Sequence, residues 1–218
     1  MILGLIGGSG FLSFPFDEKP SRVIVKTQYG DVTLQKCLFR EKTVYFLPRH
    51  GSDHSIPPHS INYRANVKAL ELVGVTHIFS TCAVGAINSA FEPGMFATCS
   101  SYLEFTKNRN STFFDSFDKG MVHTDQTNPY SVFLNDKIVN SFNDLKLPNL
   151  TNLTMVVTQG PRYETKAEIL MFKKFGGDIV GMTGYPEVVL ANELKIDYSC
   201  IAISTNYAAG ISSKPLTI

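Results

Sequence analysis

Short apolar runs alternate along the chain with stretches of helical periodicity, and this alternation predicts the order of the secondary structure. Strands are expected where mostly apolar residues stand between turn-forming residues. The expected strands are 2–6, 23–27, 32–38, 44–47, 77–81, 155–158, 178–182 and 198–204. Two of them, 23–27 and 32–38, flank Tyr29, Gly30 and Asp31, which indicates a hairpin.

Helices are expected between several of these strands. The first covers 62–73, where Ala65, Ala69 and Leu72 share one helical face and Gly74 ends the helix.

Two later helices are marked by their first residues. Thr165 and Glu168 have the spacing of a capping box, and the glycines at 176–177 end the helix that it begins. Pro186 stands where the first turn of another helix accepts proline.

The remaining segment, 100–153, is less periodic. It is rich in Asn, Asp and Pro, so we expect long loops there with one helix at about 132–142. The alternation of strands and helices predicts an α/β fold in three layers. At 218 residues an α/β fold is routinely one domain, and we expect 1–218 to form a single domain.

Composition narrows the class of protein. The chain has 20 Lys and Arg against 19 Asp and Glu, a net charge of +1 that argues against nucleic acid as a partner. Hydrophobic residues make up 44% and charged residues 18%, as in globular proteins. The apolar runs fall short of the roughly 18 residues of a membrane span. The four cysteines are widely spaced, which favours reduced thiols and a cytoplasmic protein over a zinc site or a disulfide framework.

The first candidate for chemistry is the run Gly7-Gly8-Ser9-Gly10, directly after the first expected strand. Glycines let backbone N–H groups approach an anion closely, and Ser9 adds a hydroxyl donor. A dinucleotide fingerprint is an alternative, although the spacing is not G-x-G-x-x-G and no helical pattern follows. A tight structural turn is the other alternative.

Arg49 and His50 follow the strand that ends at Leu47, and His54, His59 and His77 lie nearby. The histidine spacing does not match a metal site, so we expect no metal. An arginine at the end of a strand suits phosphate binding. A surface Arg–His pair is the alternative.

Three later segments also follow expected strands. Two of them, 160–165 and 181–187, lead into helices, and Thr205-Asn206 closes the last strand. In an α/β fold these groups would gather at the C-terminal edge of one sheet, where such folds bind ligands.

Five ordered motifs give the chain a specific resemblance to the trimeric purine nucleoside phosphorylases, above all to their 5′-methylthioadenosine phosphorylase branch, from residue 2 to about 210. The resemblance implies a three-layer sandwich around a central mixed β-sheet. It implies a homotrimer or hexamer that transfers a pentosyl group from a small purine nucleoside to inorganic phosphate. No metal or organic cofactor is implied, since phosphate is a co-substrate.

The resemblance also assigns roles to individual residues. The family's phosphate-binding positions match Ser9, Arg49, His50, the backbone of Ala83, and Thr183. Its ribose positions match the Asn62-Tyr63 region and Met182, and its base pocket matches Tyr163, Glu164, Thr205 and Asn206. His123 matches the residue that reaches the 5′ pocket of a neighbouring subunit. Asn206, Glu164 and Arg49 are the expected catalytic residues.

These residue types suit the reaction. Cleavage of an N-glycosidic bond develops positive charge on the ribose and negative charge on the departing purine. Phosphate held by Arg49 and hydroxyl donors would stabilise the ribose cation before attacking it. Asn206 can present its amide to N7 and O6, and the Glu164 carboxylate can accept from N1–H of a 6-oxopurine. Adenine has a bare lone pair at N1, which the carboxylate would oppose.

Two features select a substrate within the family. Adenosine-type relatives carry Asp at the position of Asn206, whereas 6-oxopurine enzymes carry Asn together with the Glu that Glu164 matches. The last histidine is His123, so the late histidine that inosine and guanosine phosphorylases direct at the 5′-hydroxyl has no counterpart. The sequence therefore favours phosphorolysis of 5′-methylthioinosine to hypoxanthine and 5-methylthioribose 1-phosphate. The alternatives are a 5′-methylthioadenosine phosphorylase and a general inosine/guanosine phosphorylase.

Three residues have structural alternatives. Cys82 replaces a polar residue of the family and is expected to be a buried core cysteine. Glu187 in the first turn of a helix and Arg162 in a loop are expected to be structural. Two other classes of function, a dinucleotide-dependent oxidoreductase and a noncatalytic nucleoside-binding protein, explain fewer of the motifs.

Overall fold

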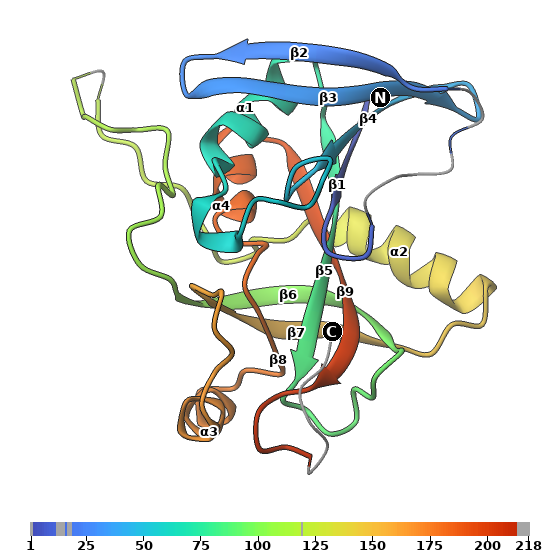
Figure 1. Cartoon of the computed structure of the whole chain (residues 1–218), viewed down its shortest axis with the longest axis vertical. Helices are drawn as coiled ribbons and strands as arrows, with labels where there is room; N and C mark the ends of the chain where they lie inside the picture. The colour runs from blue at the N-terminus through green and yellow to red at the C-terminus, as the bar shows by residue number, and fades with distance from the viewer. Residues whose placement is uncertain (1, 12–15, 17–18, 119, 213–218) are drawn as a thin grey trace.

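The computed structural model describes residues 2–11, 16, 19–118 and 120–212. In this part of the chain nine strands form one connected sheet in the order β2-β3-β4-β1-β5-β8-β7-β6-β9 (Figure 1). The strands are β1 (Leu3–Gly7), β2 (Ser21–Thr27), β3 (Gly30–Phe39), β4 (Lys42–Pro48), β5 (His77–Ala86), β6 (Phe96–Phe105), β7 (Asn149–Thr158), β8 (Ile179–Gly181) and β9 (Asp197–Tyr207).

The sheet has an open part and a closed part. In the open part β2 and β3 form the expected antiparallel hairpin, β3 pairs antiparallel with β4, and β4, β1 and β5 run parallel. In the closed part β9 pairs with both β6 and β5, so β5, β8, β7, β6 and β9 form a ring. β5 belongs to both parts. Parallel and antiparallel pairs make the sheet mixed, as the family resemblance implies.

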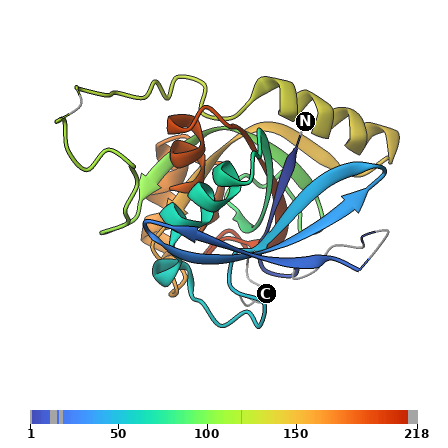
Figure 2. The same cartoon turned by 90° about the horizontal axis from the view of Figure 1, so that it is seen from above.

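Helices lie on both sides of the sheet. They are α1 (Tyr63–Leu72), α2 (Val132–Asp144), α3 (Lys166–Lys174) and α4 (Glu187–Glu193). Figures 1 and 2 show α1 and α4 side by side, with α2 on the opposite side of the central strands and α3 beside β7 and β8. This arrangement confirms the predicted three-layer α/β fold. Within the described residues no helix has the length and apolar character needed to cross a membrane.

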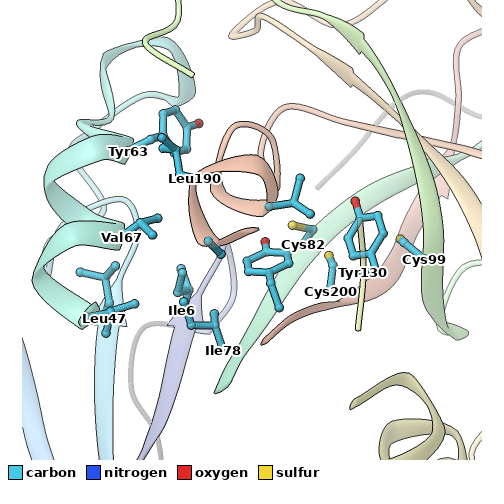
Figure 3. Packing of buried hydrophobic residues seen from close by; sticks show 14 of the residues in the cluster. Ile6, Leu47, Tyr63, Val67, Ile78, Cys82, Cys99, Tyr130, Leu190 and Cys200 are labelled. Atoms are coloured by element: carbon cyan, nitrogen blue, oxygen red, sulfur yellow. The ribbon is translucent and has the colours of Figure 1, made fainter. Parts of the chain in front are cut away.

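The core fills the space between α1, α4 and the central strands. Ile6 of β1, Ile78 of β5 and Val67 of α1 are at most 1% exposed, and Leu190 of α4 lies beside Tyr63 of α1 (Figure 3). Burial of such side chains stabilises the fold by about 1.5–3 kcal/mol each. The packing fixes the strand ends from which the site is built.

The helix starts follow the sequence prediction closely. Asn62 caps α1 by accepting the N–H of Ala65, and Thr165 and Glu168 form both bonds of the capping box of α3. Pro186 directly precedes α4. One detail of α1 was wrong, because Leu72 is 53% exposed. The helix packs on the β2–β3 hairpin and on α4, so its buried positions spread over two adjoining faces.

The segment 100–153 differs most from the prediction. It contains the second half of β6 and the first part of β7, where we expected only loops and one helix. These strands carry many polar residues, and much of their stability comes from pairing inside the ring, a long-range contact that local patterns do not reveal. The expected helix is present as α2.

Candidate active site

A cavity of about 410 Å³ opens where the ends of β1, β4 and β9 meet the loops after β7 and β8. Its size is within the range usual for small-molecule sites. The cavity is lined by Ser9, His50, His54, Ser55, Ile56, Pro57, Pro58, Ala83, Val84, Gly85, Pro161, Tyr163, Glu164, Val180, Gly181, Met182, Thr183, Thr205, Asn206, Ala208 and Ala209.

The expectation that the candidate groups share one sheet edge is only partly right. β1, β4 and β9 are parallel and deliver their residues from the same edge, but β8 runs antiparallel to β5. The loops after β7 and β8 reach the cavity from the other direction because the ring is closed. The cavity therefore forms at the junction of the open sheet and the ring.

Most of the sequence-predicted site residues come together in this cavity. Those that line it are Ser9, His50, Ala83, Tyr163, Glu164, Met182, Thr183, Thr205 and Asn206. Three predicted residues, Arg49, Tyr63 and His123, do not line it.

The glycine run after β1 forms a tight turn in which the N–H of Phe11 donates to the carbonyl of Gly8. A Cβ at Gly8 would lie 2.5 Å from the Thr81 carbonyl oxygen and 2.6 Å from Arg49 Nη1, so only glycine fits there. The turn brings Ser9 into the cavity, where its hydroxyl lies 3.3 Å from His54 Nε2. The structural turn and a role at the cavity are thus compatible.

His50 is held with one ring nitrogen facing a carbonyl. Its Nδ1 lies 2.9 Å from the Ile56 carbonyl oxygen, which can only accept, so Nδ1 carries the proton. Burial is the main cause that lowers the pKa of His50, and the neighbouring Arg49 lowers it further. A neutral His50 in this tautomer offers Nε2 as a hydrogen-bond acceptor.

Arg49 lies behind the cavity wall and is 1% exposed. Its Nε is 2.5 Å from Glu187 Oε1, its Nη2 is 3.0 Å from Glu187 Oε2, and its Nη1 donates to the Thr81 carbonyl at 2.8 Å. The alternative of a surface Arg–His pair is therefore wrong. The Arg49 side chain lies next to Gly8, as the 2.6 Å separation from an added Cβ shows.

Glu187 is the buried partner of Arg49. Burial alone would raise the pKa of Glu187, but the charge of Arg49 and hydrogen bonds from Arg49, Tyr198 and Ser80 lower it below its ordinary value. Burial opposes the charge of Arg49, but Glu187 outweighs this and raises the pKa of Arg49. The structural role expected for Glu187 therefore comes from a buried ion pair as well as from its place in the first turn of α4.

Cys82 is a buried core residue, as expected. Figure 3 shows it near Cys200 in the cluster that also contains Tyr130. A hydrogen bond with Cys200, followed by burial, raises the pKa of Cys82, which keeps the thiol protonated. Its sulfur lies 3.5 Å from the Thr183 hydroxyl, so it supports a residue that lines the cavity.

Glu164 and Asn206 are positioned by neighbouring hydroxyls. The Thr158 hydroxyl donates to Glu164 Oε1 at 2.6 Å, which leaves the other carboxylate oxygen available. The Thr205 hydroxyl lies 3.2 Å from Asn206 Oδ1 and 3.3 Å from the Val84 carbonyl oxygen. Both arrangements leave a hydrogen-bonding group of the side chain for a ligand.

Arg162 stands at the edge of this region and has the structural role expected for it. Its guanidinium donates to both carboxylate oxygens of Glu168 at 2.7 and 2.9 Å, and so ties the loop to the first turn of α3.

Tyr63 and His123 lie outside the cavity. The Tyr63 hydroxyl donates to the Pro58 carbonyl at 2.9 Å, and its ring is buried beneath Arg109. His123 belongs to the connection between β6 and α2, part of which extends away from the sheet (Figure 1), and it packs edge-on against Phe117. Neither residue lines the cavity of its own chain, so the ribose contact of Tyr63 and the contact of His123 with the 5′ pocket of a neighbouring subunit stay predictions.

Sequence reasoning missed two contributors. The loop 54–58 lines a wall of the cavity, and its only local signals were His54 and the Pro57-Pro58 pair. Arg109 donates to four carbonyls at the end of β7 and in the loop after β8, and it stands in a segment with no recognisable motif. In the described ranges no group of three or more His, Cys, Asp or Glu side chains is placed to hold a metal ion.

The comparisons with known proteins agree with this geometry. The family model described as "Phosphorylase superfamily" matches residues 3–218. The chain belongs to the phosphorylase superfamily. This membership confirms the resemblance inferred from the motifs.

Individual relatives in the superfamily are similar over nearly the whole chain. A 6-oxopurine nucleoside phosphorylase of Pyrococcus furiosus is 44% identical over 220 residues, covering 99% of this chain and 83% of the relative. A probable S-methyl-5′-thioinosine phosphorylase of Methanopyrus kandleri is 46% identical over 217 residues, covering 99% and 82%. A solved structure of Schistosoma mansoni methylthioadenosine phosphorylase in complex with adenine has a TM-score of 0.93 at 31% identity, covering 99% and 82%.

Proposed function

We propose that the protein is a purine nucleoside phosphorylase that cleaves 5′-methylthioinosine with inorganic phosphate, giving hypoxanthine and 5-methylthioribose 1-phosphate. The observation that carries this proposal is the presence of Glu164 and Asn206 in one cavity with Ser9, His50 and Thr183. The two sets provide hydrogen-bonding groups for a purine base and for phosphate. Relatives named for 6-oxopurine nucleosides and for S-methyl-5′-thioinosine support the same substrate class.

Phosphate binds, in this proposal, among the hydroxyls of Ser9 and Thr183, the backbone at Ala83, and His50. Neutral His50 accepts a hydrogen bond at Nε2 from the hydroxyl of monohydrogen phosphate. The charge of Arg49 is largely balanced by Glu187. In this proposal Arg49 helps phosphate binding by its contact with the Gly8 turn, which places Ser9 in the cavity. Positioned phosphate oxygens then stabilise the developing ribose cation and attack it.

The base is held at the other set of residues. The free carboxylate oxygen of Glu164 accepts from N1–H, and the Asn206 amide donates to N7 or O6 as negative charge develops on the purine. A 6-aminopurine has no N1–H and would face the carboxylate with a lone pair. Discrimination against it follows from this mismatch.

The apolar wall of the cavity favours a nucleoside that carries a methylthio group at its 5′ position. Ile56, Pro57, Pro58, Ala208 and Ala209 line the cavity and offer no charged group to a 5′-hydroxyl. Burial of a methylthio group against such side chains is favourable.

The active unit is proposed to be a homotrimer, or a hexamer built from trimers, in which His123 enters the 5′ pocket of a neighbouring subunit. In support, part of the connection between β6 and α2 extends away from the sheet (Figure 1) and exposes Phe114, Phe117 and Met121, which are 38%, 55% and 71% accessible. Apolar exposure on this scale is typical of a surface that another subunit covers. We further propose a cytoplasmic protein without a metal or organic cofactor, a location that suits the buried free thiols of Cys82, Cys99 and Cys200.

The test is phosphate-dependent release of free base from 5′-methylthioinosine, 5′-methylthioadenosine and inosine, compared as kcat/KM. Preference for 5′-methylthioinosine is expected. Preference for 5′-methylthioadenosine would overturn the base-pocket argument and favour the activity named for the Schistosoma structure, and preference for inosine would overturn the apolar 5′ pocket. Base binding without turnover on any nucleoside would indicate a noncatalytic binding protein.

A further inference from the structure

Arg109 follows the end of β6 and reaches the backbone at the end of β7 and in the loop after β8. Its Nη1 donates to the carbonyl oxygen of Tyr185 at 2.7 Å. Its Nη2 lies within hydrogen-bond distance of the carbonyl oxygens of Thr158 (3.2 Å), Gln159 (3.0 Å) and Met182 (2.9 Å). Because Nη2 has two hydrogens for three acceptors, one N–H is shared.

The accepting carbonyls belong to the segments that present the base and ribose contacts. Thr158 and Gln159 lead into the loop that carries Glu164, and Met182 itself lines the cavity. Hydrogen bonds from a charged donor are stronger than neutral ones, and the planar guanidinium fixes the directions of its N–H groups. One side chain thus sets the relative positions of the loops after β7 and β8.

Tyr63 connects the same guanidinium to the opposite wall. The centre of the Arg109 guanidinium lies 5.2 Å from the centroid of the Tyr63 ring, within the range of a cation–π contact. The Tyr63 hydroxyl donates to the Pro58 carbonyl oxygen, and Pro58 lines the cavity. Neither Arg109 nor Tyr63 lines the cavity itself.

We propose that Arg109 and Tyr63 act as a pair of positioning residues that sets the distance between the 54–58 wall and the 158–164 and 182–185 wall of the cavity. The pair governs how well the nucleoside is held, without touching it. This inference rests on the proposed function only for its kinetic readout. The role it gives Tyr63 is an alternative to the ribose contact that the resemblance implies.

The test uses Arg109→Ala, Arg109→Lys and Tyr63→Phe, with Arg64→Ala as the matched control. Arg64 is adjacent to Tyr63, but its guanidinium pairs with Asp115 and makes none of the carbonyl contacts. Nucleoside KM, phosphate KM and kcat are measured, together with hydrogen–deuterium exchange of 50–60, 158–165 and 181–186.

Arg109→Ala is expected to lower kcat/KM for the nucleoside by about 10- to 100-fold through misplacement of the bound substrate. The nucleoside KM should rise more than the phosphate KM, and amide exchange should become faster in both walls. Added guanidinium should restore part of the activity of Arg109→Ala and none to Arg64→Ala. Tyr63→Phe should accelerate amide exchange mainly in 50–60. The double variant Arg109→Ala/Tyr63→Phe should lose less kcat/KM than the product of the two single losses.

A merely structural role would give a different result. If Arg109→Ala lowers the Tm while nucleoside KM and exchange of 50–60 stay at wild-type values, the proposal is wrong. If Arg109→Ala does not fold, Arg109→Lys and Tyr63→Phe decide the question by the same readouts. If the wild-type protein cleaves no nucleoside, the proposed function fails, and the exchange measurements still decide whether the pair sets the two walls.

Discussion

Glu187 Oε1 lies 2.5 Å from Nε of Arg49, and both side chains are almost fully excluded from solvent. The pair joins the first turn of α4 to the end of β4, and Ser80 and Tyr198 complete its hydrogen bonds. Removal of one partner from a buried ion pair strongly destabilises a fold, whereas the complete pair changes the free energy of unfolding little compared with apolar residues of similar size. The arrangement therefore keeps a cation beside the glycine turn without leaving it unbalanced.

Glu187→Gln is expected to destabilise the fold by about 3 kcal/mol, because it leaves the buried Arg49 charge without its counter-ion. Urea unfolding at pH 7 measures the loss. Glu92→Gln, at an exposed carboxylate, is the control and should change the free energy of unfolding by less than about 0.5 kcal/mol. Equal stability of the two variants would show that the ion pair does not contribute in this way.

His50 is expected to titrate below its ordinary value of 6.5, because burial and Arg49 oppose its charged form. The unfolded chain then binds a proton at higher pH than the folded protein, so stability rises with pH between the folded pKa and 6.5 and is constant above. An NMR titration of the ring nitrogens should show the tautomer protonated at Nδ1. An apparent pKa at or above 6.5 would contradict this assignment. In the control variant His50→Asn, the rise of the free energy of unfolding with pH should disappear.

Asn206→Asp should shift base preference from 6-oxopurines toward 6-aminopurines, since the carboxylate accepts from a protonated N7 or an exocyclic amine. The ratio of kcat/KM for 5′-methylthioinosine over 5′-methylthioadenosine should fall by roughly 10- to 100-fold. Asn206→Ala is the control and should lower both activities without reversing the preference. An unchanged ratio in the aspartate variant would sink the base-pocket argument.

Gly160 has a φ of +63°, and a Cβ there would lie 2.5 Å from Met182 Sδ. Gly160→Ala is therefore expected to cost about 1–2 kcal/mol of stability from the left-handed backbone and also to displace Met182, which raises the nucleoside KM. Gly176→Ala is a matched control, because Gly176 has a φ of +86° with no atom within 4 Å of the added Cβ. It should lose similar stability at an unchanged KM, and identical kinetics of the two variants would contradict the role of Gly160 in placing Met182.

His123 is expected to act across a subunit boundary. Light scattering should give three or six times the chain mass of 24.1 kDa. His123→Ala and Asn206→Ala should each be impaired alone. After unfolding and refolding together they should regain activity, because some hybrid sites combine an intact cavity with an intact His123. Absence of any regain in mixed oligomers would place the two residues in independent roles.

Local patterns were sufficient for the elements whose stability is local. The hairpin around Tyr29, the start of α1 within one residue of Asn62, and the Thr165–Glu168 capping box all follow from neighbouring residues in the chain. β6 was missed because its burial comes from β7 and β9, which are distant in sequence. The closure of the ring by β9 depends on the same long-range pairing.

The candidate site was predictable to a similar extent. Motifs located Ser9, His50 and Asn206 at or just after the ends of strands, and Glu164 in the loop between β7 and α3. The sequence did not reveal Arg109, because an arginine in an irregular segment has no local signature for four distant carbonyl groups.

β5 belongs to both the open sheet and the closed ring. It pairs with β1, β8 and β9, and it carries Ala83 and Gly85 into the cavity. A substitution that shifts this strand would alter the shape of the cavity. It would also weaken the pairing of β5 with β8 and β9, which closes the ring. A change of substrate preference through a shift of β5 therefore also changes the stability of the fold, whereas the surrounding loops can change the cavity without breaking these pairings.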